Sequence, residues 1–198
     1  MNLPNKLTIL RIILVLVMII VNFFDLPGEF LGVPTLMWVL DLIFVIASIT
    51  DKLDGYLARS RNQVTTFGKF LDPIADKVLV ITSMIILVEI GRLPAWIPAI
   101  VVFREFIVSG YRLIAVEKSG NVIAASIWGK LKTVTQMIAI IVAFVDVNAF
   151  GTVFKGELTG WHLAINIITT VMMIVSTIAT IFSGWDYVKN GKDLLKDM

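Results

Sequence analysis

The sequence contains no cysteine and only one histidine, His162, among its 198 residues. The lack of cysteine excludes disulfide bonds and thiolate metal sites, and a single histidine excludes a histidine-rich metal site. Long polar segments are also missing, so we expect no separate soluble domain. The apolar run that follows Lys6 has no cleavage signal of small residues after it, which predicts a first span that is retained.

The composition is strongly apolar. Hydrophobic residues make up 58% of the chain and the mean hydropathy is +0.90, whereas soluble domains are roughly 45–50% apolar. A helix needs about 20 apolar residues to cross the hydrocarbon core of a bilayer. Six helical spans fit the hydropathy, at about 7–24, 35–58, 68–90, 95–116, 126–147 and 161–187. We therefore predict an all-α polytopic membrane protein with six transmembrane helices, forming a single domain over residues 1–198.

The basic residues predict how the chain lies in the membrane. With the N-terminus in the cytoplasm, the exterior connections contain only Arg92 and Lys155 of the 17 basic residues. Cytoplasmic connections of membrane proteins carry an excess of Lys and Arg. We therefore expect a multi-pass protein of the cell membrane with both termini on the cytoplasmic side.

Four aspartates gather at the end of the second predicted span and the start of the third. On a helix of about 100° per residue, an arc about 100° wide in the second span holds four residues: Asp51, Asp54, Gly55 and Ala58. In the third span, an arc of about 80° holds three residues: Gly68, Asp72 and Asp76. If these spans form an antiparallel hairpin, the acidic faces can meet and line a polar cavity that opens to the cytoplasm.

Carboxylates that converge in this way repel one another unless cations compensate them. Oxygen ligands without His or Cys favour hard divalent ions, Mg²⁺ or Mn²⁺, and this number of acids fits two ions about 3.5–4 Å apart. The stretch therefore indicates a site for phosphate chemistry, in which Gly55, Ala58 and Gly68 would let a flat base or a diphosphate approach the backbone. The alternative is a solvated loop in which the acids pair with nearby basic residues.

The acidic stretch resembles the motif of the CDP-alcohol phosphatidyltransferase family at every position and gap: Asp51-x2-Asp54-Gly55-x2-Ala58-Arg59-x8-Gly68-x3-Asp72-x3-Asp76. Four further segments resemble the members of this family that use glycerol 3-phosphate as acceptor: 2–11, 104–113, 129–137 and 183–187. The resemblance implies a six-span fold. It also implies attack of an alcohol on the β-phosphorus of a CDP-lipid, with release of CMP.

The resemblance also implies roles for single residues. Four acids would bind the two divalent ions: Asp51, Asp54, Asp72 and Asp76. Asp76 would in addition act as the general base. Three positions resemble those that the family associates with CDP-diacylglycerol: Gly55, Arg59 and Thr65. We expect the small motif residues Ala58 and Gly68 to lie at the same site. Asn5 and Thr8 of the first predicted span are further candidates to line the nucleotide pocket. The alternative role for Arg59 is an anchor at the cytoplasmic interface.

Glycerol 3-phosphate is a small dianion, and its phosphate needs fixed cations. Arginine suits bidentate contacts with phosphate oxygens. The candidates lie in the fourth and fifth predicted spans: Arg104, Arg112, Lys130 and Lys132. Glu105 is a candidate to orient one of them. The alternative for each cation is a role as interfacial anchor.

Two other functions are compatible with parts of this pattern. A sister enzyme would use another acceptor, such as inositol phosphate or serine. A divalent-cation transporter would place acids near the midplane and across several spans, whereas the acids here cluster at one interface. The expected partners are CDP-diacylglycerol, glycerol 3-phosphate, membrane lipid and, by resemblance, a second copy of the chain, but no nucleic acid. Asp41, inside the second predicted span, has no assigned role.

Overall fold

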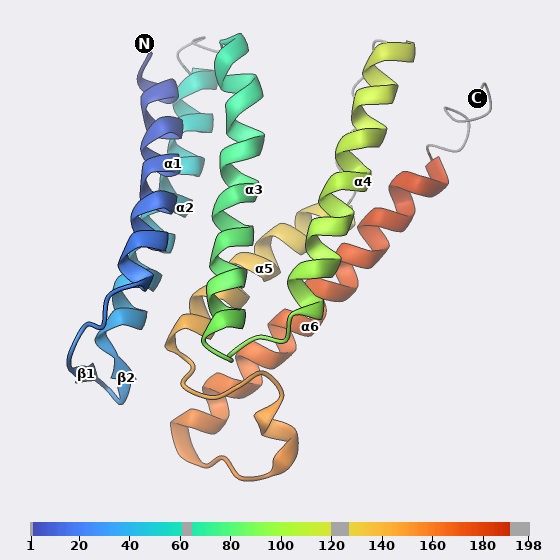
Figure 1. Cartoon of the computed structure of the whole chain (residues 1–198). Helices are drawn as coiled ribbons and strands as arrows, with labels where there is room; N and C mark the ends of the chain where they lie inside the picture. The colour runs from blue at the N-terminus through green and yellow to red at the C-terminus, as the bar shows by residue number, and fades with distance from the viewer. Residues whose placement is uncertain (1, 61–64, 120–126, 191–198) are drawn as a thin grey trace. The chain divides into compact units, whose positions relative to one another are not determined.

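The computed structural model describes residues 2–60, 65–119 and 127–190. Within these ranges, the side chains of 52, 54, 56–59, 67, 69, 113, 116–119 and 190 lie outside the description. The described residues form six α-helices, a β-hairpin and a short 3-10 helix (Figure 1). Their bounds are α1 Leu3–Asn22, β1 Glu29–Phe30, β2 Val33–Pro34, α2 Thr35–Ser60, α3 Thr66–Glu89, α4 Trp96–Ser119, α5 Ile127–Val145, η1 Thr152–Lys155 and α6 Gly160–Asn190.

Each predicted span coincides with one of these helices, so the prediction of a helical protein is confirmed. In the part of the chain that the structure describes, three helices are long and apolar enough to cross a membrane: Leu3–Asn22, Ile127–Val145 and Gly160–Lys189. The difference among the helices is one of charge. α1, α5 and α6 each contain two Asp, Glu, Lys or Arg residues, whereas α2, α3 and α4 each contain five. Most of the charged residues that are expected to take part in the chemistry lie in α2, α3 and α4, and they lower the hydropathy of these helices.

The sequence analysis did not predict the β-hairpin between α1 and α2. Glu29 pairs with Pro34 and Phe30 with Val33, in antiparallel register. The two turn residues, Leu31 and Gly32, both have positive φ, 54° and 73°. A two-residue hairpin turn of type I′ has positive φ at both positions, a backbone conformation that glycine adopts readily and leucine rarely.

The chain packs as two compact units. The first comprises the described residues of Met1–Leu93 and Ile141–Ala149, and the second those of Pro94–Ile140 and Phe150–Met198. This division concerns packing within the chain. The expectation of one functional domain over residues 1–198 stays a prediction.

In the first unit, α1 packs against both α2 and α3. Its core contains fully buried apolar side chains such as Met18, Phe44 and Leu79. The end of α5 belongs to this unit, where Arg92 Nη1 donates to the Phe144 carbonyl at 2.7 Å. Burial lowers the pKa of the Arg92 guanidinium from its ordinary value, and the Asp146 carboxylate partly counteracts this shift. Arg92 thus satisfies a carbonyl of the last turn of α5, which has no donor within the helix.

In the second unit, α4 packs against α6. Two buried polar side chains of α6 hold the segment that precedes this helix. Thr170 Oγ1 accepts from the Gly151 amide at 3.1 Å, and Asn166 Oδ1 accepts from the Val153 amide at 2.8 Å. Other hydroxyls along α6 donate to carbonyls one turn earlier, as Thr177 does to Met173 at 2.7 Å. Such bonds satisfy hydroxyl groups inside an apolar helix.

Candidate functional site

The buried face of α1 is polar in its first half and apolar in its second. Asn5, Thr8 and Arg11 are buried at three-residue intervals, followed by Val15 and Met18. Arg11 has an exposed fraction of 0% and Thr8 of 1%. Because α1 packs on α2 and α3, this polar half faces the two helices that carry the aspartates.

Two of the motif aspartates contact this polar face. Arg11 Nη1 lies 3.0 Å from Asp51 Oδ1, and Thr8 Oγ1 donates to Asp72 Oδ1 at 2.6 Å. The Asp51 side chain is nevertheless 37% exposed, and Asp72 is half-buried. Each carboxylate is therefore held from the side of α1 and remains accessible elsewhere.

Thr65 links α1 to the start of α3. Its Oγ1 accepts from the Gly68 amide at 3.0 Å, which caps the helix, and donates to Asn5 Oδ1 at 2.9 Å. A Cβ at Gly68 would lie 3.1 Å from Asn5 Oδ1 and 3.3 Å from Thr65 Oγ1. The glycine at this motif position thus permits close approach of two protein side chains. Asn5 and Thr8, predicted to line a nucleotide pocket, contact residues of the motif itself.

The expected convergence of the four acids is only partly described. Asp51 and Asp72 both meet α1, and Asp76 lies one turn after Asp72 in α3. The side chains of Asp54, Ala58 and Arg59 lie outside the described residues, although their backbone belongs to α2. Among the side chains that the structure describes, no group of three or more His, Cys, Asp and Glu residues could hold a metal ion. The chemistry of the donors still fits a hard divalent ion, because all are carboxylate oxygens and Asp51 is open to a ligand.

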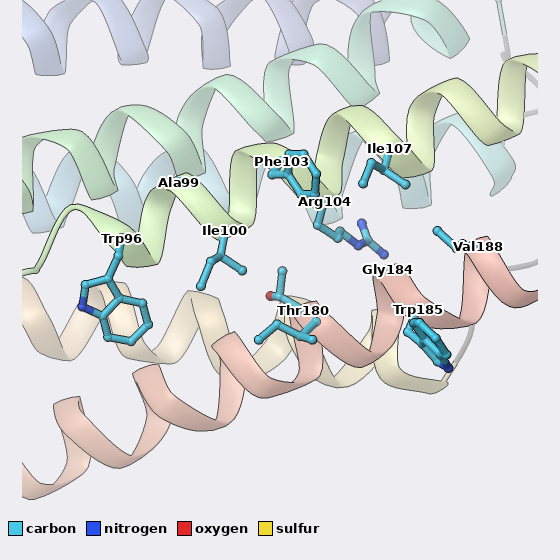
Figure 2. A pocket seen from close by; sticks show the side chains of 11 residues that line it. Trp96, Ala99, Ile100, Phe103, Arg104, Ile107, Thr180, Gly184, Trp185 and Val188 are labelled. Atoms are coloured by element: carbon cyan, nitrogen blue, oxygen red, sulfur yellow. The ribbon is translucent and has the colours of Figure 1, made fainter.

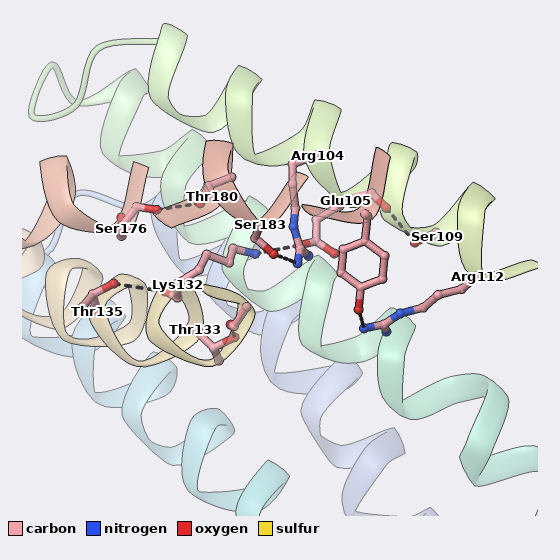
Figure 3. Close-up of polar contacts among 12 residues, drawn as sticks. Arg104, Glu105, Ser109, Arg112, Lys132, Thr133, Thr135, Ser176, Thr180 and Ser183 are labelled. Atoms are coloured by element: carbon pink, nitrogen blue, oxygen red, sulfur yellow. Dashed lines mark hydrogen bonds and ion pairs between the residues drawn. The ribbon is translucent and has the colours of Figure 1, made fainter. Parts of the chain in front are cut away.

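The second unit brings cations of α4 and α5 together around Glu105. Its Oε1 accepts from Arg104 Nη1 at 2.9 Å and from Lys132 Nζ at 2.6 Å (Figure 3). Arg104 Nη2 also donates to Ser183 Oγ of α6 at 2.5 Å. The side chains of Arg104, Glu105 and Lys132 are 11%, 13% and 9% exposed. Glu105 thus holds both cations in fixed positions and compensates one of their charges.

Tyr187 of α6 joins a second arginine to this group. Arg112 Nη2 donates to the Tyr187 hydroxyl at 2.6 Å. The guanidinium carbons of Arg104 and Arg112 lie 5.8 and 5.3 Å from the centre of the same tyrosine ring. Both distances are within reach of a cation–π interaction. Arg104, Arg112, Lys132 and Glu105, which we call the cationic cluster, carry a net charge of +2 among themselves.

Three of the four predicted acceptor residues therefore lie in one cluster. Lys130, the fourth, is exposed on α5. The sequence analysis missed two residues of α6 that contact these cations, one serine and one tyrosine. Ser183 and Tyr187 both lie in the segment 183–187, whose resemblance to the family was noted without assigning any residue in it.

An apolar groove of about 640 Å³ lies between α4 and α6, next to the cluster (Figure 2). Its lining is apolar apart from Arg104 and Thr180, and Trp96 and Trp185 are among the residues that line it. The Arg104 side chain extends from α4 toward Gly184 in this groove (Figure 2). The second unit thus places a hydrocarbon surface beside fixed positive charge, a combination that suits an amphipathic anion.

Comparison with known sequences decides the family. The model of the CDP-alcohol phosphatidyltransferase family matches residues 1–182. The chain belongs to this family. The match includes the whole acidic motif and ends one residue before Ser183. Membership, predicted from the motif, is confirmed.

Individual members are similar over almost their full length. The CDP-diacylglycerol–glycerol-3-phosphate 3-phosphatidyltransferase of Bacillus subtilis is 38% identical over 200 residues, covering 98% of this chain and 97% of that protein. The protein of the same name in Haemophilus influenzae is also 38% identical over 200 residues, covering 99% and 96%. A probable phosphatidylglycerophosphate synthase of Mycobacterium tuberculosis is 37% identical over 187 residues, covering 94% and 80%.

Proposed function

We propose that this enzyme transfers a phosphatidyl group from CDP-diacylglycerol to sn-glycerol 3-phosphate, giving phosphatidylglycerophosphate and CMP. Family membership supports the reaction class. The names of the Bacillus subtilis and Haemophilus influenzae relatives support the two substrates. The observation in this chain that carries the choice of acceptor is the cationic cluster of the second unit.

The charge of the cluster matches that of a phosphate monoester. Such a group carries about −1.5 to −2 charges at neutral pH, and the cluster offers +2. Arginine pairs form strong, directional bonds with phosphate oxygens. Serine, whose net charge is zero, would leave the net charge of +2 of the cluster without a compensating anion, because Glu105 offsets only one of its three cations. The cluster therefore favours a phosphorylated acceptor.

The proposed cofactor is a pair of Mg²⁺ or Mn²⁺ ions. Asp51, Asp54, Asp72 and Asp76 would hold them, since the chain offers carboxylates and no cysteine. When bound, such ions withdraw charge from the diphosphate and stabilise the leaving phosphate.

The chain's own residues would bind the lipid and move the proton. A P–O bond forms between the acceptor hydroxyl and the β-phosphorus, while the bond to CMP breaks and CMP leaves with its electron pair. Asp76 takes the hydroxyl proton as general base, and Arg59 pairs with a phosphate of the diphosphate. The backbone around the remaining lipid-binding candidates would face the nucleotide: Gly55, Ala58, Thr65 and Gly68.

We further propose six membrane spans, with both termini and the site on the cytoplasmic side. This placement would leave the acyl chains of CDP-diacylglycerol in lipid, while the cytidine and the acceptor come from water. Exposed side chains on α4 support contact with lipid, since Phe103 and Phe106 are 69% and 75% exposed. Soluble proteins rarely expose large apolar surfaces. By family resemblance, two copies of the chain form a homodimer in the membrane.

The decisive experiment measures CMP release by the purified chain in nanodiscs. CDP-diacylglycerol would be supplied with glycerol 3-phosphate, inositol phosphate or serine in parallel. We expect release with glycerol 3-phosphate, its loss with EDTA, and its return with Mg²⁺ or Mn²⁺. Release with inositol phosphate or serine alone would identify a sister enzyme. Full activity in excess chelator would contradict the metal centre, and cation flux into proteoliposomes without CMP release would indicate a transporter.

A further inference from the structure

We propose that Thr8 and Arg11 of α1 are positioning residues for the aspartates of α2 and α3. Arg11 orients the Asp51 carboxylate and Thr8 orients the Asp72 carboxylate, so that α1 helps to set the affinity for the divalent ions. This inference rests on the proposed metal centre. It gives α1 a part in that centre, although α1 contributes none of its proposed ligands.

The burial of Arg11 argues for a specific purpose. Its exposed fraction is 0%, in a helix whose buried face continues with Val15 and Met18. Placing a guanidinium inside an apolar helix bundle is costly unless it meets an anion. Here it lies 3.0 Å from Asp51 Oδ1. The contact joins one guanidinium nitrogen to one carboxylate oxygen, and lysine, with a single nitrogen at the end of a flexible stem, would not hold this oxygen in the same place.

Thr8 acts on the other helix in the same way. A hydroxyl that donates to a carboxylate at 2.6 Å makes a short, charge-assisted bond. This bond engages Oδ1 of Asp72 and restricts the positions that its carboxyl group can take. Residues that hold metal ligands from behind commonly change metal affinity by about 10–100-fold when they are removed.

The accessibility of the two acids fits this arrangement. Asp51 is 37% exposed although a fully buried cation holds it, and Asp72 is half-buried. α1 contacts each acid at one oxygen, Oδ1, and leaves part of the carboxylate accessible to a further ligand.

The test uses variants that keep the charge of the site, because removal of the Arg11 charge would itself alter attraction for cations. Mn²⁺ affinity would be measured by electron paramagnetic resonance in nanodiscs, without lipid substrate. We expect Arg11→Lys and Thr8→Val each to weaken Mn²⁺ binding by about 10-fold or more. Lys6→Arg on the exposed side of α1, and Thr133→Val on the exposed side of α5, should bind as the unchanged protein does.

The possible outcomes separate this proposal from the proposed function. If the unchanged protein binds no Mn²⁺, the metal centre is wrong and the positioning role falls with it. If it binds Mn²⁺ and both variants bind equally well, only the positioning role is overturned. If Thr8→Val lowers affinity for CDP-diacylglycerol at saturating Mn²⁺ but leaves Mn²⁺ affinity unchanged, Thr8 lines the nucleotide pocket instead. Thermal unfolding would verify the fold of each variant, and Thr8→Val, which keeps the side-chain shape, decides the test if Arg11→Lys does not fold.

Discussion

At the scale of single residues, Tyr187 has two separate contacts that can be removed one at a time. Its hydroxyl accepts from Arg112, and its ring lies near both Arg104 and Arg112. Arg112→Ala should raise the KM for glycerol 3-phosphate by about 10-fold or more, because a hydrogen bond from a charged group contributes about 1.5–3 kcal/mol. Tyr187→Phe keeps the ring and should raise this KM less. Steady-state CMP release at varied acceptor concentration would measure both.

Selectivity for one substrate is the control for this prediction. The KM for CDP-diacylglycerol should change little in either variant, since the cluster would contact the acceptor. Lys130→Ala provides a comparison, because it removes a positive charge from an exposed position two residues before Lys132. Equal effects of Arg112→Ala and Lys130→Ala on the KM for both substrates would show that these cations act only through general charge.

Asp76 is the residue at which proton transfer can be separated from metal binding. Asp76→Asn keeps the shape and one oxygen but cannot accept a proton at neutral pH. Turnover should fall by a factor on the order of 10²–10⁴, while binding of CDP-diacylglycerol persists. Asp51→Asn should instead weaken both metal and lipid binding. Calorimetry in nanodiscs at fixed Mg²⁺, alongside CMP release, would measure these effects.

Two results would reject the base assignment. Near-normal turnover of Asp76→Asn would show that Asp76 does not take the proton. Loss of CDP-diacylglycerol binding as complete as in Asp51→Asn would make Asp76 chiefly a metal ligand.

The sequence indicated the chemistry of these residues better than their partners. The spacing of the aspartates identified the family, which the comparison confirmed. Arg11 was overlooked because a single charge inside an apolar run gives no sign of what it faces. Its three-residue spacing from Asn5 and Thr8 was visible, but this stripe has meaning only once α1 is known to pack on α2 and α3.

At the scale of elements, the start of α3 depends on Thr65. Its side chain caps the helix by accepting from the Gly68 amide and also bonds Asn5. Loss of a helix cap typically costs about 1 kcal/mol. Thr65→Val should therefore lower the midpoint of thermal unfolding, whereas Thr65→Ser, which keeps the hydroxyl, should restore it. An unchanged midpoint in Thr65→Val would mean that the cap contributes nothing measurable.

Helix positions were predictable because each apolar run has nearly the length of its helix. The third predicted span, 68–90, is α3 Thr66–Glu89, and the last, 161–187, is α6 Gly160–Asn190. The β-hairpin was not predictable in the same way. Its strands have two residues each, and its turn places Leu31 at a positive φ that leucine seldom adopts. Local backbone choices of this kind follow from the surrounding structure rather than from a residue pattern.

At the scale of the whole molecule, the lack of cysteine allows a direct test of orientation. A single cysteine introduced as Lys155→Cys should react with a membrane-impermeant maleimide added to intact cells. Lys6→Cys should react only after the membrane is permeabilised, because the excess of basic residues predicts a cytoplasmic N-terminus. The unchanged chain has no thiol and supplies the blank. The reverse labelling pattern would invert the proposed topology.

The uneven distribution of charge among the helices has a consequence for biosynthesis. A charged residue at the centre of a helix costs about 2.5–3.5 kcal/mol when the helix inserts from the translocon. In the six-span topology, α1 could enter the bilayer alone, whereas α2, α3 and α4, with five charged residues each, emerge next and gain from a helix already in place. Arg11 would then be the first countercharge that Asp51 meets as the nascent chain leaves the ribosome.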